Sequence, residues 1–183
     1  TQGVSSAASD VYKRQDVVTR VRSLEALLAW TQGRAAPDER DAAAQAPLSY
    51  EERCDALVLM VPCWVYLFPR LALSPSQRLR MLALQIHAEL LAPPRAGSGA
   101  ASVREELLAP ANIEAIASFW AILAHDSSRA VARLGRSLWD DCVSWDSGAS
   151  DRVPVHDLLG VLMEQLRPCL LYTSPSPRDL STS

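Results

Sequence analysis

The chain has 183 residues, including 12 prolines and 7 glycines, with 49% apolar residues, 21% charged residues and a formal net charge of −3 at pH 7. Such a length fits one compact domain, and the composition is too apolar for a disordered tail and too charged for an integral membrane protein. The negative net charge argues against a protein that coats nucleic acid with its whole surface, but it is compatible with a local basic face.

The two ends of the chain differ from its middle. Residues 1–15 and 169–183 are rich in small polar residues or proline and share no apolar period with the interior. The strings SAASDVYKRQ and LLYTSPSPRD resemble peptides translated from sequencing-adapter DNA; natural disordered tails are the alternative. We therefore expect both ends to be disordered and to flank a folded interior of residues 16–168, itself a piece of a longer protein.

Helix starts are well marked in the first half of the chain. Asp16 precedes apolar residues at a 3.6-residue period and is expected to cap a helix. Residues 49–52 and 74–77 have the pattern of capping boxes, the second with proline at the first helical position. The helix after the first box contains an uncharged run, residues 56–69, which is shorter than the about 20 residues that a membrane span requires. Its two prolines, at 62 and 69, predict a bend or a break.

The second half continues the helical pattern. Residues 102–105 form a third capping box, and the helix that follows is expected to stop at Pro110 and resume to about Ala124. Asp126 is expected to cap a fifth helix, and Pro154 to begin a sixth that runs to about residue 167. Because alternating short strands are absent from the sequence, the predicted class is all-α with about six helices.

Two helix pairs share one layout at a spacing of 52 residues. In each, an apolar helix bearing Trp64 or Trp120 ends in a short turn, at Ser74 or Asp126, and leads into a helix with an apolar stripe. The stripes are Leu79, Leu82, Ala83, Ile86 and Leu90 in the first pair and Val131, Leu134, Gly135, Leu138 and Cys142 in the second. This repeat predicts a HEAT/ARM-like helical-repeat solenoid fragment, with an irregular bundle as the alternative. The two tryptophans are predicted core residues.

No pattern in the sequence predicts an active site. The three histidines, His87, His125 and His156, lie far apart, and no C-x-x-C pair, glycine-rich phosphate loop or G-x-S-x-G occurs. We place His87 at the surface or rim of its helix. The prediction is therefore a fragment with no catalytic residue, no metal site and no cofactor.

Arginines gather around the two turns that join the paired helices. If equivalent turns line up on one edge of a solenoid, these side chains form a basic stripe that can bind phosphate. The candidate stripe consists of Arg70, Arg78, Arg80, Arg129 and Arg133. The alternative is that the same arginines pair inside the repeat with acidic residues, namely Asp126, Asp140 and Asp141.

Three segments carry more specific patterns. Residues 16–24 have the pattern D-x-x-T-R-x-R-S-L, residues 62–72 have P-x-W-x-x-x-F-x-R-L-A, and residues 120–133 have W-x-x-x-x-x-D-x-x-x-x-V-A-R. In this order and spacing they resemble the amino-terminal helical-repeat region of listerin, the RING-type E3 ubiquitin ligase of ribosome-associated quality control. Residues 78–80 continue the likeness as R-L-R, where the family carries R-V-R. Ser74 stands where the family usually has Asp.

The resemblance implies a docking and scaffold fragment of a listerin-like E3 ubiquitin ligase that acts on nascent chains on stalled large ribosomal subunits. It implies contact with the large subunit and with the protein that marks the stalled complex, in the cytosol and on the ribosome. Zinc and a ubiquitin-charged E2 would belong to the RING, whose Cys/His ligands have no counterpart in this sequence. We expect a monomer without membrane contact.

Two other classes stay open at this point. One is an unrelated HEAT-repeat scaffold that binds proteins, of the transport-receptor or adaptor type. The other is a small helical enzyme whose site carries no recognisable motif. Both share the helical physics and differ in partner or chemistry.

Overall fold

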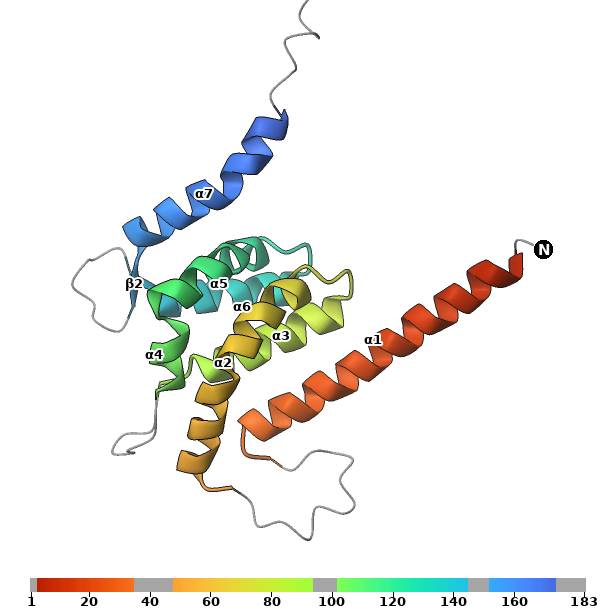
Figure 1. The fold of residues 1–183 in the computed structure, drawn as a ribbon, viewed down its shortest axis with the longest axis horizontal. Coiled ribbons are helices and arrows are strands. Elements are labelled where there is room, and N and C mark those ends of the chain that lie inside the picture. The colour runs from red at the N-terminus through yellow and green to blue at the C-terminus, as the bar shows by residue number, and fades with distance from the viewer. Residues whose placement is uncertain (1–2, 35–47, 94–101, 145–151, 174–183) are drawn as a thin grey trace, which may run out of the picture.

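The computed structural model describes residues 3–34, 48–93, 102–144 and 152–173 of the chain. These residues form seven helices and one pair of very short strands, which confirms the predicted all-α class (Figure 1). In chain order the elements are α1 (Gly3–Thr31), α2 (Tyr50–Ala72), α3 (Gln77–Leu90), α4 (Val103–Leu107), α5 (Pro110–Ala124), α6 (Arg129–Cys142), β1 (Val143–Ser144), β2 (Val153–Pro154) and α7 (Val155–Thr173).

The predicted helix pairs are present as two stacked hairpins. Helices α2 and α3 form the first hairpin and α5 and α6 the second, with α2 packed on α5 and α3 packed on α6. Helix α1 packs along α3, and α7 packs on α5. The described part of the chain is therefore a stack of helices in which the turns of both hairpins lie on the same side of the molecule (Figure 1).

Helix α2 begins and continues for identifiable reasons. The Ser49 hydroxyl accepts the Glu52 N–H at 3.2 Å, and the Glu52 carboxylate accepts the Ser49 N–H at 2.8 Å, which confirms the first capping box. Of the predicted bend or break, a break does not occur, because α2 runs through Pro62 and Pro69 without ending. Packing of its buried face, which includes Trp64, outweighs the two missing N–H donors. By length and composition alone α2 could also cross a membrane, but its buried residues belong to the core.

Two other predicted helix starts differ from the structure. The cap of α3 is Ser76, and its preceding turn is closed by the Ser74 hydroxyl, which accepts the Ser76 N–H at 3.3 Å. The predicted capping box at 74–77 is therefore wrong, and the proline precedes the helix. At α6 the N-cap is Ser128, and Asp126 instead accepts the Ser128 N–H at 2.7 Å. In both cases the polar side chain orders the turn rather than the helix end.

Of the remaining predicted helix boundaries, some agree with the structure and one does not. Ser102 caps α4 by accepting the Glu105 N–H at 3.1 Å, and α5 runs from Pro110 to Ala124 as predicted. Pro154 does not begin a helix: it lies in β2, which pairs in parallel with β1, and α7 starts at the next residue. The strands were missed because two residues each are too short for an alternating pattern.

The chain ends also differ from expectation. Helix α1 begins at Gly3 rather than at Asp16, and α7 runs to Thr173, so residues 3–15 and 169–173 are helical where disorder was predicted. No proline interrupts residues 3–15, and extending an existing helix costs far less than nucleating one. The rest of the two predicted disordered segments, residues 1–2 and 174–183, lies outside the described residues.

The core lies between the hairpins. Trp64 and Trp120 are 1% and 0% exposed, which confirms both as core residues. Gly135 lets the second hairpin close tightly, because a Cβ there would lie 2.7 Å from the backbone carbonyl carbon of Leu123. This contact brings α6 against α5 closely enough to fix where the turn between them lies.

Candidate docking surface at the turn edge

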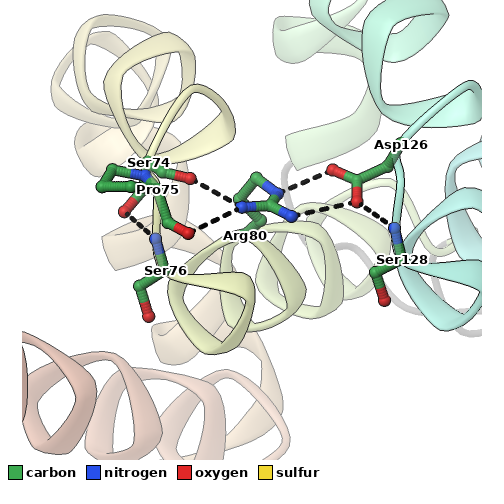
Figure 2. A network of polar contacts seen from close by, with 6 residues as sticks. All are labelled: Ser74, Pro75, Ser76, Arg80, Asp126 and Ser128. Atoms are coloured by element: carbon green, nitrogen blue, oxygen red, sulfur yellow. Dashed lines mark hydrogen bonds and ion pairs between the residues drawn. The ribbon is translucent and has the colours of Figure 1, made fainter.

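Arg80 joins the two hairpin turns. Its Nε and Nη2 groups donate to the two carboxylate oxygens of Asp126 at 2.6 and 3.0 Å, and Nη1 donates to the carbonyl oxygens of Ser74 and Pro75 at 2.8 and 3.2 Å (Figure 2). One guanidinium therefore connects the α2–α3 turn to the α5–α6 turn. We call this end of the hairpins the turn edge: residues 73–76 and 125–128 with the arginines beside them.

The Arg80–Asp126 pair is largely withdrawn from water. The two side chains are 13% and 8% exposed, and the bidentate geometry is the strongest that a guanidinium and a carboxylate can adopt. The hydrogen bonds from Arg80 hold the pKa of the Asp126 carboxyl below its ordinary value of 3.8, against the opposing effect of burial. Asp126 neutralises Arg80, as the alternative account of the arginines expected for this residue. Arg80 thus positions the turns.

Two other arginines of the candidate stripe are exposed but engaged. Arg78 forms an ion pair at 2.6 Å with Glu25 of α1, in which the side chains are 57% and 36% exposed. Arg70 donates to the Tyr66 carbonyl oxygen at 2.7 Å, and its guanidinium carbon lies 3.6 Å from the centre of the Tyr66 ring. Exposed pairs of this kind contribute little stability, so both guanidinium groups can exchange partners at small cost.

Arg129 and Arg133 complete the stripe and differ from the other three. They lie four residues apart at the start of α6, both are exposed, and neither has an ion-pair partner among the described residues. Positive charge in the first turn of a helix is disfavoured by the helix dipole. This penalty applies to Arg129, the first residue of α6, whereas Arg133 lies one turn further along; no carboxylate among the described residues pairs with either of them. Of the five predicted arginines, only these two have neither an ion pair nor a hydrogen bond nor a ring contact among the described residues.

The structure also contains a buried histidine that sequence reasoning misplaced. His87 is 0% exposed rather than at the surface, and its imidazole lies between the indole N–H groups of Trp64, 2.9 Å from Nδ1, and Trp120, 2.8 Å from Nε2. The Phe68 ring stacks on it at 4.1 Å. We call these four residues the His87 cage. The available signal was that two buried tryptophans each need an acceptor, and His87 lies one helical turn from Ala83 of the apolar stripe.

The His87 cage is short of one acceptor. A neutral imidazole has a single lone-pair nitrogen, whereas both indoles can only donate, so His87 accepts one indole N–H at a time and turns its own N–H toward the other. Burial lowers the pKa of His87 to about 3, which keeps the ring neutral at physiological pH. With no exposed atom, this histidine cannot reach a substrate. The cage is a core feature that joins α2, α3 and α5.

Metal-ligating side chains and thiols were the other candidates for a site in the described part of the chain. No group of three or more His, Cys, Asp or Glu side chains comes together among them. The described cysteines, Cys54, Cys63 and Cys142, are free thiols, and burial raises the pKa of Cys142 and so disfavours its reactive thiolate. The turn edge is therefore the surface that we consider further, because the predicted arginines lie near it in the chain.

The sequence of the chain matches the model of a known protein family. The model of the family described as E3 ubiquitin-protein ligase listerin, N-terminal domain, matches residues 11–144. The matched range contains all of the three segments whose patterns resemble that family, and it begins five residues before the expected start of the interior. Comparison with curated proteins and with solved structures gave no match.

Proposed function

The chain belongs to the listerin N-terminal domain family, and on this premise we propose that it is the docking and scaffold domain of a listerin-like E3 ubiquitin ligase. In this proposal the domain attaches the ligase to large ribosomal subunits that hold a stalled nascent chain. Its further partner is the protein that marks the stalled complex, and its location is the cytosol. Ubiquitin transfer, with zinc and a ubiquitin-charged E2, would be performed by a RING outside residues 1–183.

The observation that carries the proposal is the pair of uncommitted arginines at the start of α6. Ribosomal RNA presents phosphates, and a guanidinium meets a phosphate with two parallel hydrogen bonds. A phosphate bound beside Arg129 would compensate both the arginine charge and the positive end of the helix dipole. Docking would thus remove an electrostatic cost that the free domain carries.

The neighbouring arginines extend this surface. Arg78 can exchange its exposed Glu25 partner for phosphate, and Arg70 offers a cation stacked on an aromatic ring that is itself 60% exposed. Arg80 supports the surface from beneath, because its contacts fix the position of one turn relative to the other. The proposed docking surface is therefore Arg70, Arg78, Arg129 and Arg133, with Arg80 as a positioning residue.

Co-sedimentation with purified large ribosomal subunits tests the proposal. Arg129→Gln combined with Arg133→Gln should lower the bound fraction at least tenfold without changing the thermal unfolding midpoint, because neither side chain supports the fold. The matched control is Arg22→Gln combined with Arg34→Gln, which removes the same charge from exposed positions on and just after α1. Equal loss of binding in the two double variants would show that only net charge matters and would overturn the assignment of the surface.

A further inference from the structure

A second surface lies at the opposite end of the hairpins from the turn edge. There the carboxyl ends of α3 and α6, helix α4, the start of α5 and the first two turns of α7 enclose a groove of about 1140 Å³. Its floor is apolar and mostly buried, and it is formed by Leu91, Ile113, Leu134, Leu138 and Val161. We call it the α6–α7 groove. The volume slightly exceeds the about 300–1,000 Å³ of ordinary small-molecule sites, which favours a peptide-sized occupant.

The two arginines that line the groove are committed to the backbone. Arg104 donates to the carbonyl oxygens of Leu91 and Asp141 at 2.6 and 3.2 Å, and Arg152 donates to the carbonyl oxygen of Asp140 at 3.3 Å. These carbonyls belong to the ends of α3 and α6, which otherwise have no intrahelical donor. Both cations thus complete helix ends.

The carboxylates at the groove outnumber its two arginines, so its lining is net acidic. Four acidic side chains line it and all are exposed: Glu105, Glu114, Asp141 and Asp157. Neither Glu105 nor Asp141 has an ion-pair partner in the described part of the chain, and the contact of Asp157 is an exposed one with His156. An apolar floor with an acidic rim is complementary to a segment whose apolar anchors are flanked by Lys or Arg.

We propose that the α6–α7 groove binds a basic amphipathic segment of a partner protein. Its apolar side chains would cover the floor around Leu134 and Leu138, and its cations would meet the carboxylates of Asp141 and Asp157. This interaction is separate from the proposed ribosome docking: it uses the opposite end of the helices and the opposite sign of charge. A variant that blocks the groove should therefore keep its binding to large ribosomal subunits.

A fluorescein-labelled 14-residue amphipathic helix of leucine and lysine is the probe, and the same peptide with glutamate in place of lysine is its control. We expect the lysine peptide to bind at least tenfold more tightly in fluorescence anisotropy. Asp141→Asn combined with Asp157→Asn should weaken binding at least fivefold. Ser137→Arg, which places a large cation at the groove from an exposed position, should have the same effect while leaving the unfolding midpoint unchanged.

Three results would overturn the proposal. Equal binding of the two peptides would remove the role of the acidic rim. Equal weakening by Glu51→Gln combined with Asp55→Asn, which neutralises two exposed carboxylates on α2, would show unspecific charge attraction. Self-association of the chain in sedimentation velocity that Ser137→Arg abolishes would make a second copy the occupant in place of a partner protein.

Discussion

The turn edge and the α6–α7 groove lie at opposite ends of the same helices and use charge in opposite ways. At the turn edge an acidic side chain, Asp126, neutralises the half-buried arginine, and the arginines left over are exposed. At the groove the arginines bind helix-end carbonyls, and the carboxylates outnumber them. At both ends some charged side chains hold the helices together, and the other charged side chains determine whether the surface is positive or negative.

The difference teaches that the role of an arginine depends on where its helix face points. Arg78 and Arg80 are two residues apart, so they lie on nearly opposite sides of α3. Arg78 meets a partly exposed carboxylate on α1, whereas Arg80 is half-buried between the turns. The formal net charge of −3 therefore does not indicate the local charge of either the turn edge or the α6–α7 groove.

Removing the half-buried arginine, Arg80, should have the largest effect. Arg80→Gln leaves Asp126 without its cation and two carbonyls without their donor, and we expect a loss of about 3 kcal/mol in the free energy of unfolding. Arg78→Gln is the matched control and should cost at most about 0.5 kcal/mol, because its ion pair is exposed. Urea unfolding followed by circular dichroism measures both. Equal losses of unfolding free energy in the two variants would contradict the distinction between Arg80, which positions the turns, and Arg78, which lies at the surface.

The dependence of stability on pH should distinguish the contribution of the His87 cage from that of the charged groups at the two ends of the hairpins. His87 has a folded pKa of about 3 against an ordinary value of 6.5, so the unfolded chain takes up its proton first as the pH falls. Stability should therefore fall between pH 6.5 and pH 3, by up to about 1.4 kcal/mol per pH unit. The contribution of Asp126, whose pKa is lowered, is lost only below about its ordinary value of 3.8.

Unfolding free energies at pH 6.5 and 4.5 measure the difference, which should reach about 2 kcal/mol in the wild type. His87→Gln should flatten this dependence even though it destabilises the protein at every pH, and His125→Gln, at an exposed position, should leave it unchanged. A dependence that survives His87→Gln would assign the acid sensitivity to the surface charges at the ends.

A smaller effect should come from the contact that sets the distance between α5 and α6. Gly135→Ala places a Cβ against the backbone of Leu123 and Ala124, and the forced shift should cost about 1–3 kcal/mol. Gly160→Ala is the control: a Cβ there meets nothing within 4 Å, so the better helix propensity of alanine should stabilise α7 slightly. Thermal unfolding distinguishes the two signs. Stabilisation by Gly135→Ala would contradict the close approach of α6 to α5.

Local patterns in the sequence predicted much of the fold. The 52-residue spacing identified both hairpins, and the Ser49 capping box marked the start of α2, because these signals depend on residues close together in the chain. The ends of α1 and α7 were misjudged, since composition alone does not stop a helix that has already formed. The strands β1 and β2 depend on a pairing between segments ten residues apart and have no pattern of their own.

The site was predictable only as a set of residues. Clustered arginines indicated the turn edge, but nothing in the sequence tells which of them is half-buried, since the carboxylate that holds Arg80 lies 46 residues away. His87 was misplaced for the same reason: its partners are 23 and 33 residues distant and come from two other helices. Polar groups are buried or exposed according to partners that only the tertiary fold supplies.

The salt dependence of binding to large ribosomal subunits tests the central claim most directly. Each phosphate contact adds about 0.7–0.9 to the slope of log K against log salt concentration. For the wild type we predict steep weakening with salt, and for Arg129→Gln with Arg133→Gln a slope that is shallower by about 1.5. A wild-type affinity that is insensitive to salt, or identical slopes for the two proteins, would contradict docking through the exposed arginines of the turn edge.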